Sequence, residues 1–472
     1  MPHDFVPELL ARATEALERE FGGLPAYELY AGGNAKALAG VLDETAHRLG
    51  NNYPYFHPLY AGQMLKPPHP VARAAYALAM KINPNNHALD GGRASSAMEV
   101  EAVREIAGMF GWKEYLGHLT SSGTFANLEA LWMAGLLAEE QGTEGLGTRG
   151  RRRIVGSEQA HYTHQRISAV LKLEYTAVAT DGAGRMSLDA LEAELRKGNV
   201  GTVVATLGTT AMGAVDPLEE ILALAGQYGC RVHVDAAYGG YFGLIAEELD
   251  EPARQAYAAM GRADSIVIDP HKHGLQPYGC GCVLFKDPAV GRFYKHDSPY
   301  TYFTSKELHL GEISLECSRA GAAAVALWAT QRLLPLKQGG EFARGLAMGR
   351  RAAVELDRRL REDERFVTLA ELPPRSENPD LGHPHPPELD IVVWALHAAD
   401  PRKASEQAQK VFDACAKRGL HLALVQLPAS WFRHEWRGEH VTCLRSVLMK
   451  PEHKAWLDGI WERLSEACGE AV

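Results

Sequence analysis

The stretch IDPHKHGLQPYGCG, residues 268–281, places a lysine between two histidines in a turn that joins two apolar runs. Ser265–Ile268 precedes the turn and Cys282–Phe285 follows it, and both runs have the continuous apolar character of strands that are buried on both faces. An unpaired ammonium group in such surroundings is costly unless it is neutralised or used. Lys272 therefore either bends out into water, the ordinary case for a lysine, or has a chemical role.

The same pattern of strands recurs upstream of the turn. Apolar strands over Val203–Leu207 and Val232–Asp235 are separated by an expected helix. Asp216 is the expected N-cap residue of that helix, Pro217 its first position and Gly229 its end. Apolar strands separated by helices predict an α/β fold, with a mostly parallel sheet sandwiched by helices.

The composition along the chain predicts a division into three segments. We predict an N-terminal arm at residues 1–85, where a helix over Val6–Glu20 is followed by loops rich in Gly, Pro and Asn that have little core of their own. Residues 86–340 carry the alternating strands and helices of a large domain. A Pro-rich stretch at 371–390 precedes further strands and helices, so residues 341–472 are expected to contain a small α+β domain.

Bulk properties exclude several classes of protein. A net charge of −10 over 472 residues argues against binding to nucleic acid. No run of about 18 apolar residues exists, and the acidic N-terminus does not resemble a signal peptide, so no membrane span is expected. Seven scattered cysteines without a CxxC pair indicate a reducing compartment, and a cytoplasmic location is expected.

Polar residues mark the ends of two expected strands. Asp235 closes one strand, and His271 and Lys272 follow the next, which suits a ligand site at the carboxyl edge of the sheet. A buried salt bridge between Asp235 and Lys272 is the structural alternative. Upstream, Ser122, Gly123 and Thr124 begin an apolar helix whose free N–H groups suit a phosphate, although hydroxyl residues are common at helix starts.

A lysine, a carboxylate and a phosphate cradle together fit pyridoxal 5′-phosphate (PLP). The motifs HVDAAYGG (233–240), DPHKHG (269–274) and TSSGTFANLEAL (120–131) resemble those of the group II PLP-dependent amino-acid decarboxylases of fold type I. The resemblance extends from about His57 to about Leu334 and is closest to tyrosine-, aspartate- and glutamate-decarboxylase-like members. It implies a fold type I enzyme that binds PLP.

The resemblance implies nine cofactor-binding residues: Ser122, Gly123, Thr124, His161, Thr210, Asp235, Ala237, His271 and Lys272. Lys272 is similar to the lysine that forms the Schiff base, and Asp235 to the acid that pairs with the ring nitrogen. His161 and Ala237 are expected on the two faces of the ring, and Thr210 near its 3-oxygen. The residues of the helix start would hold the phosphate, and His271 would contact the phosphate or the Schiff base.

The resemblance also implies residues for catalysis and substrate binding. Tyr302 is similar to a mobile-loop tyrosine that protonates the substrate carbon after CO2 leaves, with Tyr300 as an equal candidate. Lys272, His161, His271 and Tyr302 are thus the expected catalytic residues. Tyr60 and Gln63 fall in the segment that lines the side-chain pocket, and the glutamine hints at a polar substrate. Arg319 is either a carboxylate or phosphate contact at the rim or a surface arginine.

No metal site is predicted, because the pairs His161/His164 and His383/His385 have no third ligand at helical spacing. The implied activity is α-decarboxylation of an aromatic or acidic L-amino acid, which yields CO2 and a primary amine. Another fold type I PLP enzyme (a lyase, desulfurase or aminotransferase) or a non-catalytic dimeric relative is the alternative. The family's shared pocket and the coreless arm imply a homodimer with a shared active site.

Overall fold

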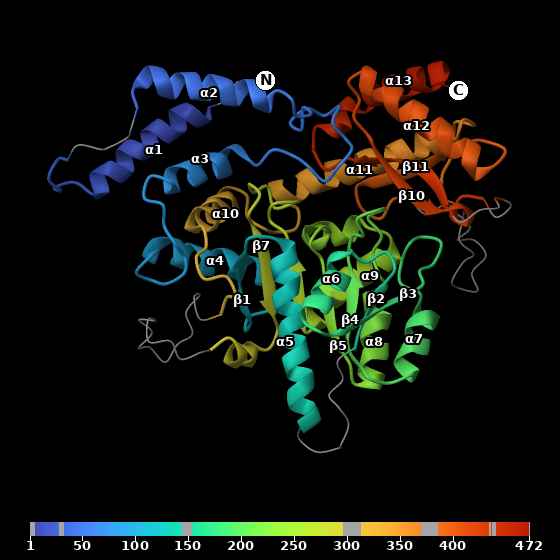
Figure 1. Cartoon of the computed structure of the whole chain (residues 1–472), viewed down its shortest axis with the longest axis horizontal. Coiled ribbons are helices and arrows are strands. Elements are labelled where there is room, and N and C mark those ends of the chain that lie inside the picture. The colour runs from blue at the N-terminus through green and yellow to red at the C-terminus, as the bar shows by residue number, and fades with distance from the viewer. Residues whose placement is uncertain are drawn as a thin grey trace.

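A seven-stranded sheet forms the centre of the molecule (Figure 1). The computed structural model describes residues 5–27, 33–143, 153–295, 313–369, 386–433, 436 and 440–471. The strand order is β1-β7-β6-β5-β4-β2-β3. In chain order the strands are β1 (Leu116–Thr120), β2 (Arg153–Ser157), β3 (Glu174–Val178), β4 (Val200–Thr206), β5 (Arg231–Asp235), β6 (Ser265–Ile268) and β7 (Gly281–Phe285).

Most of the sheet is parallel, as the apolar runs predict. Strands β3, β2, β4, β5 and β6 pair in parallel, whereas β7 is antiparallel to both β6 and β1. The short turn 268–281 explains this exception, because it joins two neighbouring strands directly and returns the chain in the opposite direction. All residues of β6 and β7 are buried, so the turn that carries Lys272 does join two buried strands.

Helices cover both faces of this sheet. Side chains alternate along a strand, so Val267 and Val283 pack with the long helix α5 on one face. Ile266 and Leu284 belong to a second cluster, which contains residues of α4 and α8. The helices of this region are α4 (Arg93–Met109), α5 (Gly123–Thr143), α6 (Thr163–Val170), α7 (Leu188–Arg196), α8 (Leu218–Tyr228), α9 (Glu251–Ala259) and α10 (Gly321–Leu333). The predicted α/β fold, a mostly parallel sheet sandwiched by helices, is confirmed.

The predicted cap of α8 is wrong. Asp216 lies before the helix, but its side chain turns inward and accepts hydrogen bonds from the backbone N–H groups of Met186 and Thr206, at 2.7 and 2.8 Å. The helix begins at Leu218 without a side-chain cap. The predicted end is confirmed, because Gly229 adopts a left-handed conformation with φ of 66°.

The C-terminal part of the chain contains a second sheet, which is antiparallel and has four strands in the order β10-β11-β9-β8. Its strands are β8 (Phe366–Val367), β9 (Ile391–Leu396), β10 (Ala423–Pro428) and β11 (His440–Val447). Three helices pack against it or against each other: α11 (Glu341–Arg361), α12 (Pro401–Lys417) and α13 (His453–Ala471). The exact domain boundaries remain a prediction, but residues beyond 341 do form an α+β unit.

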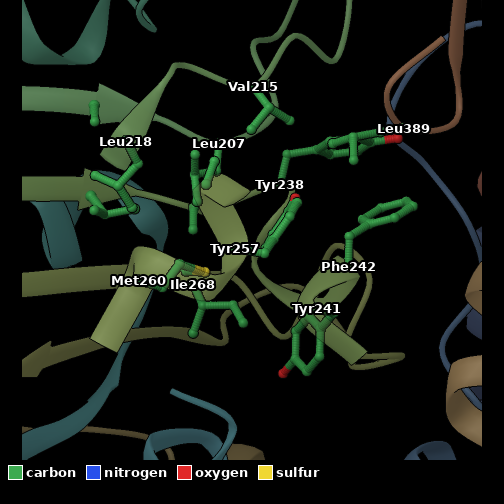
Figure 2. Close-up of a cluster of buried hydrophobic side chains, with 14 of the residues drawn as sticks. Leu207, Val215, Leu218, Tyr238, Tyr241, Phe242, Tyr257, Met260, Ile268 and Leu389 are labelled. Carbon is green, nitrogen blue, oxygen red and sulfur yellow. The ribbon is translucent and has the colours of Figure 1, made fainter. Parts of the chain in front are cut away.

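The main apolar core continues between the two sheets (Figure 2). Leu207, directly after β4, and Tyr238, after β5, belong to one cluster with Leu389, which lies two residues before β9. The loops at the carboxyl edge of the large sheet are therefore packed between two sheets. This packing fixes the loops that follow β4 and β5.

The N-terminal arm contains α1 (Val6–Glu20), α2 (Ala35–Leu49) and α3 (Pro70–Ala79). α3 packs against α10 and α1 packs against α3, whereas α1 and α2 contain no buried residue. In Figure 1 the first two helices lie outside α3 at the edge of the molecule. The arm thus lacks a core of its own within the chain. None of the helices described here combines the length and apolar character needed to cross a membrane.

Candidate active site

A cavity of about 190 Å³ lies at the carboxyl edge of the large sheet. Its walls come from the loops after β4, β5 and β6, the start of α5 and the segment before α6. The lining residues are Ser122, Gly123, Thr124, Asn127, His161, Thr163, Thr206, Gly208, Thr210, Asp235, Ala237, Tyr238, Asp269, His271 and Lys272. All nine residues that the sequence analysis assigns to the cofactor line this one cavity.

Asp235 ends β5, where its backbone still pairs with β4 and β6. Its Oδ2 atom accepts a hydrogen bond from Nε2 of His164 at 2.8 Å, and its Oδ1 atom accepts one from the backbone N–H of Ala237 at 3.1 Å. Burial by itself would raise the pKa of Asp235, but the hydrogen bond from His164 and the nearby charge of Lys272 outweigh it and hold the pKa well below its usual range. The site therefore contains a permanent carboxylate.

Lys272 lies four residues after the end of β6, in the loop that connects β6 to β7. Its Nζ atom is 3.3 Å from Oδ2 of Asp269, and its side chain is 23% exposed. The amine is thus neither fully solvated nor paired with Asp235. The structure supports neither alternative from the sequence, the solvated lysine or the salt bridge between Asp235 and Lys272. The amine lies at the cavity wall, and the acid beside it is Asp269.

His271 is held between two oxygen atoms. Its Nδ1 atom donates to the backbone carbonyl of Cys280 at 2.7 Å, because a carbonyl oxygen only accepts. Its Nε2 atom is 3.5 Å from Oδ2 of Asp269, and its ring packs against Tyr278. The imidazole is therefore fixed in orientation at the cavity wall.

His161 lies before α6, where its Nδ1 atom accepts a hydrogen bond from the backbone N–H of Thr163 at 3.3 Å. Burial lowers the pKa of His161, the charge of Lys272 lowers it further, and Asp235 opposes the shift. A neutral imidazole is consequently favoured near neutral pH. Such a ring can pack flat against an aromatic ligand without bringing a second cation into the site.

The start of α5 meets the turn that carries Lys272. A Cβ atom on Gly123 would lie 2.4 Å from Oδ2 of Asp269, so only glycine lets the helix start come this close to the acid. The N–H groups of the first turn, which have no partner within the helix, carry a partial positive charge. Oδ1 of Asp269 and Oγ1 of Thr206 are buried beside the same cavity without a hydrogen-bond partner among the described groups.

A second hollow of about 380 Å³ adjoins the cavity, and the two share His161 and Thr210 as wall residues. Gln63 and Arg445, from the arm and from β11, face each other there: Nη1 of Arg445 donates to Oε1 of Gln63 at 3.2 Å. The other guanidinium hydrogen bonds go to backbone carbonyls, including that of Thr210 at 2.7 Å. No carboxylate of the described residues pairs with this buried cation.

Two of the expected substrate residues lie away from the cavity. Arg319 is buried, with its Nη1 atom 2.6 Å from Oε1 of Glu99, and further bonds go to the carbonyls of Leu119 and Asn86. The surface alternative is wrong because the side chain is 6% exposed and pairs with Glu99, whereas a contact to a substrate carboxylate or phosphate stays a prediction. Tyr60 is also buried, with its ring against Lys450, and does not line the cavity.

Further sequence-derived residues cannot be placed. Tyr302 and Tyr300 lie outside the described residues, as do His383 and His385. The catalytic role of Tyr302, or of Tyr300 in its place, therefore stays a prediction. Among the side chains that the structure describes, no group of three or more His, Cys, Asp or Glu has the arrangement of a metal site.

Sequence reasoning missed three residues that shape the site: His164, Asp269 and Arg445. Asp269 stands in the quoted motif, three positions before the lysine, which is a signal that could have been used. His164 enters the sequence analysis only as one of a pair of histidines without a third metal ligand. Arg445 comes from a strand of the other sheet, about 170 residues after Lys272, and nothing local marks it.

The residues of the cavity fit PLP. A phosphate needs an anion-binding helix start, the aldehyde needs an amine, and the ring nitrogen needs a carboxylate, and all three line the same hollow. Gly123 lines the cavity, and its missing side chain leaves room for the Asp269 carboxylate beside the helix start. The neutral imidazole of His161 suits a ring face. Lys272, Asp235 and the start of α5 would hold the cofactor.

Comparisons with known proteins agree with this geometry. The family described as "Pyridoxal-dependent decarboxylase conserved domain" matches residues 53–373. An L-tyrosine decarboxylase of Enterococcus faecium is 28% identical over 465 residues, 79% of this chain and 75% of the relative. A probable L-tyrosine/L-aspartate decarboxylase of Methanothermobacter thermautotrophicus is 27% identical over 350 residues, 74% of this chain and 86% of the relative.

The fold has counterparts among solved structures. The Oryza sativa TDC structure with PLP and tryptamine superposes with a TM-score of 0.76 at 18% identity, covering 99% of this chain and 96% of that one. The match to a decarboxylase family favours the decarboxylase prediction over a lyase of another kind, a desulfurase, an aminotransferase or a scaffold. The chain belongs to the pyridoxal-dependent decarboxylase family and is a PLP-dependent amino-acid decarboxylase of fold type I.

Proposed function

We propose that this decarboxylase acts on an aromatic or acidic L-amino acid in the cavity between β5, β6 and α5, and that it releases CO2 and the corresponding primary amine. One observation carries the placement of the chemistry: Lys272, Asp235 and the start of α5 line a single cavity. The names of the relatives, tyrosine and aspartate decarboxylases, support the substrate class.

The roles of the polar residues follow from charge. When bound, PLP supplies an electrophilic aldehyde and an electron-accepting ring that stabilises the charge left as the carboxyl group departs. Lys272 provides the amine that holds the aldehyde. Asp235, kept anionic by its two donors, holds a proton on the ring nitrogen. The role of Asp235 needs an ionised carboxylate, which its hydrogen-bond donors favour.

The remaining cavity residues bind and orient the cofactor. His161 and Ala237 line the cavity and would pack on the two faces of the ring, where a neutral imidazole would avoid repulsion with a protonated ring nitrogen. The N–H groups of Gly123 and Thr124, with the Ser122 hydroxyl, bind the phosphate. Thr210 and His271 line the same cavity as Lys272 and would lie near the ring. Together these contacts fix the plane in which the reacting bond is presented.

The adjoining hollow is the proposed substrate pocket. Arg445 is a buried cation whose hydrogen bonds go to carbonyl oxygens and to Gln63, so a carboxylate of the substrate would give it the negative partner that the described residues do not. The apolar wall formed by Leu424 and Val425 suits carbon atoms of the side chain. This arrangement favours a substrate amino acid that binds with a carboxylate directed toward Arg445 of β11.

CO2 release from a panel of tyrosine, tryptophan, aspartate and glutamate tests the substrate class. The purified holoenzyme is expected to act on tyrosine or aspartate with a kcat/KM at least about 100-fold above the least active amino acid, a ratio that unpaired polar groups can provide. Equal and slow release from all four, or release only from an amino acid outside the panel such as a basic one, would overturn the proposed class.

We also propose a homodimer. One face of α2 presents Leu38, Val41, Leu42 and Leu49, which are all more than half exposed in the single chain. A helix with an apolar stripe of this kind normally buries it. A second copy is the favoured occupant, because the family's pocket is shared between two subunits. The cytoplasmic location and the catalytic tyrosine, Tyr302 or Tyr300, stay predictions.

A further inference from the structure

His164 lies behind the cavity wall rather than in it. It is the second residue of α6 and is completely buried. Its Nε2 atom donates to Oδ2 of Asp235 at 2.8 Å, and a carboxylate oxygen can only accept, so Nε2 carries the hydrogen. His164 does not line the cavity, and the only side-chain hydrogen bond of its imidazole among the described groups goes to Asp235, which does.

The imidazole and a backbone group together fix the plane of the Asp235 carboxylate. Oδ2 is bonded to His164, and Oδ1 is bonded to the N–H of Ala237 at 3.1 Å. A carboxylate with a single donor can rotate about its Cβ–Cγ bond, whereas donors on both oxygens hold it in one orientation. Each oxygen keeps a lone pair, and Asp235 lines the cavity.

Packing does not explain a histidine at this position. Nδ1 of His164 is buried and has no hydrogen-bond partner among the described groups. An unsatisfied buried nitrogen costs free energy that an apolar side chain of similar volume would avoid. The hydrogen bond from Nε2 to Asp235 therefore explains why a histidine, and not an apolar residue, stands at position 164.

The neighbouring histidine does not compete for His164. The rings of His164 and His233 are 6.3 Å apart, but His233 donates from Nε2 to Oδ1 of Asn127 and accepts at Nδ1 from the Ser265 hydroxyl. Burial lowers the pKa of His233 to about 3, so it stays neutral. Both ring nitrogens of His233 are thus engaged elsewhere, and His233 does not compete for the imidazole of His164.

We infer that His164 is a positioning residue, which holds the Asp235 carboxylate ionised and aimed at the ring nitrogen of the cofactor. This inference rests on the proposed role of Asp235. Without the imidazole, the carboxylate would keep one donor, turn more freely and attract the ring proton less strongly. The cofactor would then bind more weakly, and its ring nitrogen would lose its proton at lower pH.

The test compares His164→Leu, which removes the donor, with His164→Gln, whose amide nitrogen can take the place of Nε2. PLP affinity is measured by titrating each apoprotein, and the pH midpoint of the bound cofactor's visible absorbance is followed separately. His164→Leu is expected to weaken PLP binding about tenfold and to shift the midpoint, as loss of a charge-assisted hydrogen bond should. His164→Gln is expected to recover most of both properties.

Ser168→Ala is the matched packing control. Its hydroxyl donates to the backbone carbonyl of His164 at 2.8 Å without touching Asp235, so PLP affinity should stay within about twofold of the wild type. If His164→Leu does not fold, His164→Asn replaces it, since the shorter amide does not reach Oδ2. Equal PLP affinity and equal midpoints in the glutamine and donor-free variants would overturn the inference.

A double-mutant cycle separates this inference from the role on which it rests. In an Asp235→Asn background, His164→Leu should have little further effect on PLP affinity, because the two residues act as one unit. Additive effects would show that His164 acts on something other than Asp235. If Asp235→Asn alone leaves PLP affinity and the midpoint unchanged, the role of Asp235 itself is wrong, and the inference fails with it.

Discussion

The Nζ atom of Lys272 lies 3.3 Å from Oδ2 of Asp269, whereas Asp235 is bonded to His164 and not to the lysine. The two charged groups of the site thus have separate partners although they line one cavity. This separation matters because a direct salt bridge would occupy both groups at once. Instead the amine and the carboxylate are each available for a different end of the same ligand.

Replacing Lys272 by alanine should abolish both cofactor attachment and turnover. The amine is the nucleophile that faces the cavity, and the shorter side chain supplies none. We expect the purified variant to lack the visible absorbance of bound PLP and to release no measurable CO2. Lys286→Ala, an exposed lysine just after β7, is the control and should retain both. Turnover in the Lys272 variant would show that another group holds the cofactor.

Gly123→Ala should damage the site through a steric clash. The added methyl group would lie 2.4 Å from the Asp269 carboxylate, which is buried and cannot move away easily. We expect a loss of about 1–3 kcal/mol in the free energy of unfolding and weaker PLP binding. The control is Gly108→Ala on an exposed face of α4, where nothing lies within 4 Å. That change should stabilise the protein by about 0.5–1 kcal/mol, and equal effects of the two changes would contradict the steric argument.

Local sequence patterns were enough to predict the sheet and part of the cavity, whereas His161, Thr210 and Ala237 were implied by the family resemblance. The apolar runs around 268–281 mark buried strands, and the residues at their carboxyl ends must meet at one edge of the sheet. Thus the sequence alone predicts that Asp235 and Lys272 lie at the same edge of the sheet. The start of α5 at Gly123 lies at the same edge of the sheet, because α5 packs on the face of the sheet formed by Val267 of β6 and Val283 of β7.

Contacts between distant parts of the chain could not be read from the sequence. Arg319 sits where a resemblance suggests a ligand contact, but Glu99 of α4 captures its guanidinium. Asp216 has the spacing of a helix cap, yet two strand N–H groups from other segments bind it more effectively. Arg445 reaches the pocket only because the two sheets pack together. Each case depends on which element becomes a neighbour, and local spacing does not contain that information.

The buried acid Asp216 should make folding stability depend on pH. Burial raises its pKa to about 7, since its two backbone donors compensate only part of the lost hydration. The folded state therefore binds a proton that the unfolded state has released at intermediate pH. Stability from this group is present below the unfolded pKa, near 4, and is lost as pH rises to about 7, by at most about 1.4 kcal/mol per pH unit.

Asp216→Asn isolates that contribution. The amide does not titrate, so denaturant unfolding of the variant between pH 4 and pH 7 should lack the part of the slope that Asp216 supplies. A constant offset is expected as well, because an amide cannot accept at both positions. The comparison uses the slope and not the offset. Parallel curves for the variant and the wild type would show that Asp216 stays ionised when buried.

Gln63→Glu should impair substrate binding more than the chemical step. A carboxylate at this exposed position would pair with Nη1 of Arg445, which the neutral amide now contacts at 3.2 Å. It would compete with the substrate carboxylate, so KM is expected to rise roughly threefold to tenfold while kcat changes less. Gln63→Ala removes the acceptor without adding charge and should change KM little. A glutamate variant with unchanged KM would remove Arg445 from the proposed pocket.

Leu38→Glu together with Leu42→Glu should separate the proposed dimer. These side chains form the exposed apolar stripe of α2 and make no contribution to the core of the single chain, so charges there should leave the fold intact. We expect sedimentation to show a species of half the mass, with lower activity per chain, because the pocket is shared in the proposed assembly. Lys36→Glu, a charge change on the same helix, is the control and should remain dimeric. A double variant that stays dimeric and fully active would place the subunit contact elsewhere and leave the stripe on α2 for a different partner.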